Sequence, residues 1–190
     1  THRLFVYDFT RNTHPGMTEA ERGYWRDVGS IESYWESNMD LVSVSPVFNL
    51  YNNKWPIRTP NWHLPPAKFV FADKERSRLG IATDSLGSEG SIISGGHLNR
   101  TIVFPNVRIN SFCYITDSII MDGVEIGRYA RIKRAIIDKD ARVGSHVVIG
   151  YDPKEDRRRF HVSPGGIVVI QKGEVIEAEK KPFVPVGEII

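Results

Sequence analysis

The chain has 190 residues, 41% of them hydrophobic and 25% charged, which is enough for one or two domains with a proper core. Its net charge of +2 gives no electrostatic footprint for a nucleic-acid partner, and no run of about 18 apolar residues predicts a membrane span. The single cysteine, Cys113, excludes an internal disulfide and favours a reducing, cytoplasmic setting. The first residue is Thr1, with no Met start or signal-peptide pattern, so we expect the chain to belong to something longer.

The first 47 residues predict the last pieces of an α/β domain. Residues 4–9 are apolar enough for a strand, and residues 24–28 predict a second short extended piece. Ser30 is a suitable N-cap for a helix predicted over residues 31–44. Because these pieces cannot close a domain by themselves, we interpret residues 1–47 as an incomplete domain end.

Residues 48–72 predict a connector between two domains. Prolines stiffen the segment and exclude a regular helix, and its tryptophans suggest that it packs against both neighbours. The residues concerned are Pro56, Pro60, Pro65, Pro66, Trp55 and Trp62.

Aliphatic residues recur every 17 positions between residues 81 and 149, in three series separated by steps of six, five and six. The series are Ile81, Leu98, Ile115, Ile132 and Ile149; Leu86, Val103, Ile120 and Ile137; and Ile92, Ile109, Ile126 and Val143. Such a period predicts a parallel β-helix with three flat faces, each coil pointing one aliphatic side chain inward from each face. Small residues two positions before these sites suit tight corners. The alternative is an ordinary β-sandwich, which needs no constant spacing.

The predicted β-helix domain covers residues 73–190. Residues 152–159 are charged and predict a helical turn, and residues 167–170 predict a strand that forms a closing coil. We expect the tail, residues 174–190, to be partly disordered.

Asp27 is the first candidate for chemistry, because a carboxylate between an extended segment and a helix start can hold a hard cation such as Mg²⁺. From spacing alone, the competing interpretation is that Asp27 merely helps to cap the helix that starts at Ser30.

Several segments together resemble bacterial glucose-1-phosphate adenylyltransferase, and the resemblance covers residues from about 24 to 172. The motifs are YWRDVGSI at residues 24–31, WPIRT at 55–59, LPPAKF at 64–69, VRINSFC at 107–113 and GIVV at 166–169. The resemblance implies that the β-helix is the left-handed, hexapeptide-repeat kind. The residues alone do not give this handedness.

The resemblance also implies an activity. The family makes ADP-glucose and pyrophosphate from ATP and glucose 1-phosphate with Mg²⁺, for glycogen or starch synthesis. It implies that Asp27 is one of two metal-holding aspartates and that Trp25 lines the sugar-phosphate site. No glycine-rich nucleotide loop is present, so we expect this chain to be the C-terminal part of the enzyme and to be inactive alone.

Two lysines carry the expected regulation. The family is controlled by phosphorylated effectors bound between its domains, and Lys139 and Lys172 match basic positions used for these anions. Relatives place an arginine at the first position, so effector identity stays open. A run at residues 157–159 keeps the ordinary interpretation of solvated arginines. The resemblance further implies a homotetramer.

Alternatives of other classes remain at this point. The parent could use another sugar phosphate or nucleotide, or the β-helix could be a non-catalytic assembly module. Independent hexapeptide enzymes would need a catalytic histidine or a zinc site, and His97 and His146 are not spaced to stack in one column. A reactive Cys113 is a further, weaker alternative, because nothing basic in sequence lowers its pKa.

Overall fold

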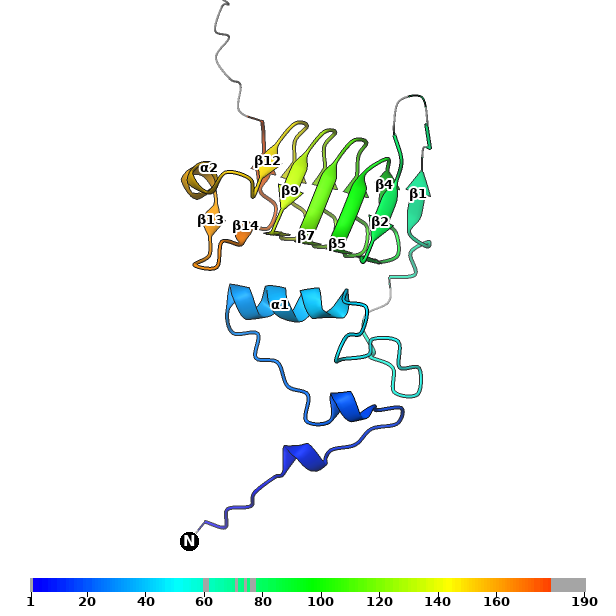
Figure 1. The fold of residues 1–190 in the computed structure, drawn as a ribbon, viewed down its shortest axis with the longest axis vertical. Helices are drawn as coiled ribbons and strands as arrows, with labels where there is room; N and C mark the ends of the chain where they lie inside the picture. Colours follow the sequence, from blue (N-terminus) through cyan, green and yellow to red (C-terminus); the bar gives the residue numbers. More distant parts are fainter. Residues whose placement is uncertain (1, 60–61, 71, 74, 76–77, 179–190) are drawn as a thin grey trace, which may run out of the picture.

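A three-sided parallel β-helix forms most of the molecule; the long helix of the N-terminal arm lies alongside it, and the segment before that helix extends away from it (Figure 1). The computed structural model describes residues 2–59, 62–70, 72–73, 75 and 78–178. The helices are η1 (Phe9–Arg11), η2 (Glu19–Glu21), α1 (Ile31–Leu41) and α2 (Pro153–Arg159). The strands are β1 (Lys68–Val70), β2 (Ile81–Thr83), β3 (Leu86–Gly87), β4 (Ile92–Ser94), β5 (His97–Val103), β6 (Arg108–Ile109), β7 (Tyr114–Ile120), β8 (Glu125–Ile126), β9 (Arg131–Lys133), β10 (Ala135–Ile137), β11 (Arg142–Val143), β12 (Val148–Ile149), β13 (His161–Val162), β14 (Val168–Ile170) and β15 (Val175–Ile176).

Parallel strands stack along each of the three faces. The first face has the order β1-β4-β6-β8-β11-β15. The second face joins β2, the first halves of β5 and β7, β9 and β12; the third joins β3, the second halves of β5 and β7, β10 and β14. Strands β5 and β7 each run continuously around one corner, so the second and third faces share them. The β-helix begins at Lys68, inside the segment predicted as a connector.

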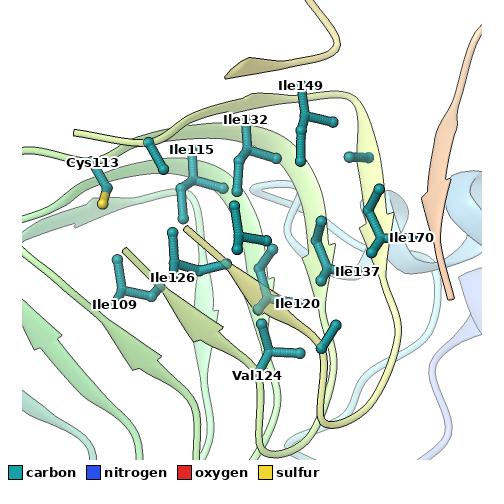
Figure 2. Packing of buried hydrophobic residues seen from close by; sticks show 14 of the residues in the cluster. Ile109, Cys113, Ile115, Ile120, Val124, Ile126, Ile132, Ile137, Ile149 and Ile170 are labelled. Atoms are coloured by element: carbon teal, nitrogen blue, oxygen red, sulfur yellow. The ribbon is translucent and has the colours of Figure 1, made fainter. Parts of the chain in front are cut away.

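The predicted aliphatic ladders fill the interior of the prism (Figure 2). Ten of the thirteen predicted positions are buried, among them Ile115, Ile120 and Ile126 at 0% exposure. Most of the predicted small-residue positions are buried as well: Thr101, Cys113, Ser118, Ala130, Ala135 and Ala141 are each 0% exposed, whereas Gly90 in the first coil is only half-buried. A narrow prism has room for one aliphatic side chain from each face in each coil, and this explains the strict residue types.

The first coil departs from the prediction because it is one residue shorter. Ala82, not Ile81, lies opposite Leu98, and Ile93, not Ile92, lies opposite Ile109. One missing residue moves a strand's side chains to the opposite face. Burial of Ile81, Leu86 and Ile92 was therefore wrongly predicted: Ile81 is 37% exposed, and Ile93 takes an interior place at 1%.

The β-helix continues beyond Ile149 after an insertion. Helix α2 and strand β13 form the insertion, after which β14 stacks in parallel on β10 and β15 on β11. The predicted closing strand is thus confirmed, as is the helical turn, which begins at Pro153 after the N-cap Asp152. Strand β13 pairs antiparallel with β14 and covers its outer edge. Part of the tail predicted as disordered, residues 179–190, lies outside the described residues.

The N-terminal arm is less regular than predicted. Helix α1 has the predicted N-cap, since the Ser30 hydroxyl accepts from the Ser33 N–H, but it ends at Leu41. The strand predicted at residues 4–9 is wrong: Leu4 and Val6 are 95% and 98% exposed, and no described strand pairs with this segment. A strand needs a partner for its backbone groups, and neither this segment nor residues 24–28 finds one among the described residues.

Helix α1 covers the outer side of the third face. Its side chains Trp35, Met39 and Val42 pack on Ile102 and Ile119, with Ile136 and Ile167 completing this second cluster. Outward positions of β5, β7 and β10 are therefore apolar where α1 lies. In the part of the chain that the structure describes, no helix has the length and apolarity needed to cross a bilayer.

Candidate functional site

The segment that carries Trp25 and Asp27 lies on the surface just before α1. The carboxylate Oδ1 of Asp27 accepts a hydrogen bond from the Gly29 N–H at 3.1 Å and closes the turn that leads to Ser30. Ser30 itself caps the helix, so Asp27 is not the N-cap. The Trp25 ring is 76% exposed and contacts Phe9 edge-on, with ring centroids 6.2 Å apart.

A small aromatic cavity lies in the N-terminal arm. Its lining includes Phe9, His14, Tyr24, Phe48 and Trp55, but not Trp25. Glu21 also lines it, although sequence reasoning did not select this residue. The Glu21 carboxylate is 4% exposed and accepts from the backbone N–H of Thr18 and of Asn49, at 2.8 and 3.1 Å. These bonds, led by that from Thr18, lower the pKa of Glu21 and so favour the ionised carboxylate.

The donor set around Asp27 fits part of a magnesium site. Among the described residues, no three His, Cys, Asp or Glu side chains are grouped to hold a metal ion. Mg²⁺ commonly takes one or two protein carboxylates and completes its octahedron with water and phosphate oxygens. Asp27 is exposed and supplies one such carboxylate, so the chain can contribute one protein ligand of the expected kind.

The two candidate effector lysines lie at one corner of the β-helix, which we call the lysine corner. Ile137 pairs with Ile170, and Lys139 and Lys172 each lie two residues beyond these partners. The Gly173 N–H donates to the Lys139 carbonyl at 2.9 Å, which ties the two turns together. Sequence reasoning selected the lysines separately. The two lysines occupy equivalent positions in adjacent coils, but the α2 insertion lengthens the chain between them, so they are not 17 residues apart.

Asp138 contacts Lys139 at the lysine corner. Its Oδ1 accepts from the Lys139 backbone N–H at 2.7 Å and lies 3.9 Å from the Lys139 ammonium. Both side chains are substantially exposed, at 50% for Lys139 and 37% for Asp138, so solvent screens this ion pair.

A cleft between α1 and the third face begins beside this corner. The α1 side consists of residues 28–31 and Tyr34, and the β-helix side includes Met121, Ile136, Asp138 and Val169. Burial raises the pKa of Tyr34, and the negative charges of Asp138 and Asp122 raise it further. Asp138 therefore lies close enough to α1 to affect the pKa of Tyr34, a placement that its sequence position did not indicate.

Hydrogen bonds and a cation–π contact fix helix α1 to the β-helix. The Trp35 indole N–H donates to the Asp117 carbonyl at 2.9 Å, and the Arg134 guanidinium lies over the Trp35 ring at 4.6 Å. The Glu32 carboxylate accepts from the Gly165 N–H at 2.8 Å. These contacts join α1 to two coils and to the loop after β13, so the segment before α1 is anchored on the β-helix.

Cys113 is buried, and His97 and His146 each stack on an aromatic ring. Burial raises the pKa of the Cys113 thiol to about 11, which agrees with a structural thiol and not a nucleophile. His97 stacks on Tyr114 and His146 on Tyr129, with ring centroids 4.9 and 4.8 Å apart. No zinc-type group occurs among the described residues.

Residues 65–170 match the family model described as GlmU-like, C-terminal hexapeptide. The chain is 54% identical over 175 residues to a glucose-1-phosphate adenylyltransferase of Anaeromyxobacter sp. (strain Fw109-5), covering 92% of this chain and 43% of the relative. Identity is 47% to the enzyme of that name from Bifidobacterium adolescentis and 49% to that from Geobacter metallireducens, over 90% of this chain and 41% and 42% of those relatives. The chain thus spans about two fifths of the length of these curated relatives, in their C-terminal part. The hexapeptide match agrees with the expected left-handed β-helix.

Proposed function

This chain belongs to the GlmU-like, C-terminal hexapeptide family, and from that premise we propose that it is the β-helical part of a glucose-1-phosphate adenylyltransferase. The observation that carries the proposal is similarity over nine-tenths of the chain, which includes the Asp27 segment as well as the β-helix. A relation confined to the hexapeptide coils would support only a shared fold.

The proposed reaction joins ATP to glucose 1-phosphate. A phosphate oxygen of the sugar phosphate attacks the α-phosphorus of ATP in line, and pyrophosphate leaves, giving ADP-glucose. Within this chain, Asp27 offers an exposed carboxylate to Mg²⁺, and the exposed Trp25 ring offers an apolar wall for the sugar. Bound there, Mg²⁺ would neutralise negative charge on the phosphate oxygens. The fixed turn from Asp27 to Gly29 positions that carboxylate relative to α1.

The lysine corner is the proposed place for phosphorylated effectors. Two ammonium groups on adjacent coils can face one polyanion, and lysine acts as a point charge that tolerates several phosphate arrangements. The proposed effectors are therefore phosphorylated metabolites as a class. A homotetrameric assembly and a cytoplasmic location complete the proposal.

One other function stays open, a β-helix that only assembles other subunits. It predicts no nucleotidyl transfer by the longer protein that contains this chain. The test is pyrophosphate release by that protein with glucose 1-phosphate, Mg²⁺ and each of the common nucleoside triphosphates in turn. The proposal expects release with ATP well above the other nucleotides. Release with a different nucleoside triphosphate alone would mean that the enzyme is a nucleotidyltransferase of other specificity. No release with any of these nucleotides would favour the assembly module.

A further inference from the structure

Asp138 lies between the lysine corner and the N-terminal end of α1. If effectors control catalysis in the proposed enzyme, binding at the first must affect the second. On one side its carboxylate Oδ1 is within 3.9 Å of the Lys139 ammonium, at the lysine corner. On the other side it lines the cleft that faces residues 28–31, at the N-terminal end of α1. Asp138 therefore borders both the lysine corner and the cleft beside the helix that follows Asp27.

The ion pair at the lysine corner is easily disturbed. Its 3.9 Å separation is at the long end of a salt bridge, and both partners are exposed to water. A phosphorylated ligand carries more negative charge than one carboxylate and would attract the Lys139 ammonium away from Asp138. The backbone hydrogen bond from the Lys139 N–H, at 2.7 Å, would keep the Asp138 carboxylate in place.

The end of α1 that faces Asp138 is the end that attracts negative charge. Unpaired N–H groups and the helix dipole give a helix N-terminus a partial positive charge, and this effect decays within the first turn. A carboxylate that loses its lysine partner acts more strongly on this end. Gly29, which precedes the cap, donates its N–H to Asp27 at 3.1 Å, so a shift of this turn reaches the candidate metal ligand directly.

We propose that Asp138 transmits anion binding at the lysine corner to the first turn of α1 and, through Gly29, to Asp27. The inference rests on the proposed function for the meaning of Asp27, but the physical link can be measured in this chain alone. With the corner empty, the Lys139 ammonium partly offsets the negative charge of Asp138 beside the α1 N-terminus. With an anion bound, Asp138 holds the α1 N-terminus more tightly.

The test is hydrogen–deuterium exchange of this chain, with inorganic phosphate as the probe and sodium chloride of equal ionic strength as the reference. Phosphate should slow exchange at residues 138–142 and 171–174, and should slow exchange at residues 29–34 by about two- to fivefold. In Asp138→Asn the slowing at the corner should remain, and that at residues 29–34 should disappear. Asp140→Asn is the matched control: Asp140 lines the neighbouring cavity beside Trp62, not the α1 cleft.

A second variant tests the link without phosphate. Lys139→Met removes the partner of Asp138, so exchange at residues 29–34 should slow even in the reference buffer. Unchanged exchange there, or slowing by phosphate that persists in Asp138→Asn, would overturn the link while leaving the lysine corner as an anion site. If phosphate slows exchange neither at the lysine corner nor at residues 29–34, both the proposed effector site and this link are wrong.

Discussion

At single positions of this protein, the available volume and the exposure to water determine which side chain can be accommodated. Cys113 occupies a corner position at 0% exposure, where the neighbouring coils offer Ala130 and Gly96. Its thiol contacts the Gly127 carbonyl at 2.9 Å. Only a small side chain fits such a corner, so its identity follows from volume and not from thiol chemistry.

Cys113 should therefore react very slowly with alkylating reagents. Because burial raises the pKa of its thiol to about 11, little thiolate forms near neutral pH, and reagents have no access to it. Iodoacetamide labelling followed by mass spectrometry should give almost no product in the native protein and complete labelling in guanidinium. Rapid labelling of native protein would contradict the assignment of a structural thiol.

Glu32 gives the stability a pH dependence. Its pKa is lowered by the Ser163 hydroxyl and then by the Gly165 N–H, so the carboxylate is stabilised in the folded state relative to its ordinary pKa of 4.5. The resulting stability is present above that value and is lost as pH falls through the folded pKa. Wild type should melt at a higher temperature than Glu32→Gln at pH 7, and the gap should shrink by about pH 3. A gap that grows on acidification would reverse the sign and refute this account.

At the scale of elements, the 17-residue repeat correctly predicted the regular coils. It did not predict the shorter first coil or the coil interrupted by α2. Interior ladders are visible because each coil repeats the same volume constraint at a fixed spacing. The first coil lacks one residue, which a 17-residue period cannot detect, so Ile81 and Ile92 were placed on the wrong side. The insertion with α2 hid the relation of Lys139 to Lys172, and the position of Asp138 beside α1 depends on the packing of that helix, which no local pattern encodes.

The two kinds of isoleucine provide a matched pair of substitutions. Ile115→Asp would bury an unpaired carboxylate at a site with 0% exposure and should cost about 3–5 kcal/mol. Ile81→Asp makes the same chemical change at a site 37% exposed and should cost less than about 1 kcal/mol. Urea unfolding of both variants measures the difference. Equal costs would mean that the ladder does not form the core.

At the scale of the whole molecule, the two ends of the solenoid differ. At the C-terminal end, β13 covers the outer edge of β14, while β12 and β15 each pair with one neighbour only among the described strands. At the other end, β1, β2 and β3 each pair with one neighbour only among the described strands, and Phe69 is 48% exposed. Strand edges and apolar ends of this kind are normally capped or paired.

We therefore expect the chain to self-associate at micromolar concentration. Sedimentation velocity should show species larger than the 21.6 kDa monomer, and Phe69→Glu should weaken the association, because it places a charge on the open end. Lys68→Gln, on the same strand, makes the charge more negative by the same single unit and is the control for a charge change alone. A 21.6 kDa monomer at all concentrations would contradict the expected assembly.

Whether the segment before α1 supplies a metal-binding carboxylate to an adenylyltransferase can be decided with Asp27→Asn in the full-length protein. Asparagine keeps an oxygen that can accept from the Gly29 N–H, so the turn should survive while the negative charge is lost. If Asp27 binds Mg²⁺ in the transition state, kcat for ADP-glucose formation should fall by roughly 10²–10⁴. If Asp27 only closes the turn, activity should be nearly unchanged, and that result would contradict the account.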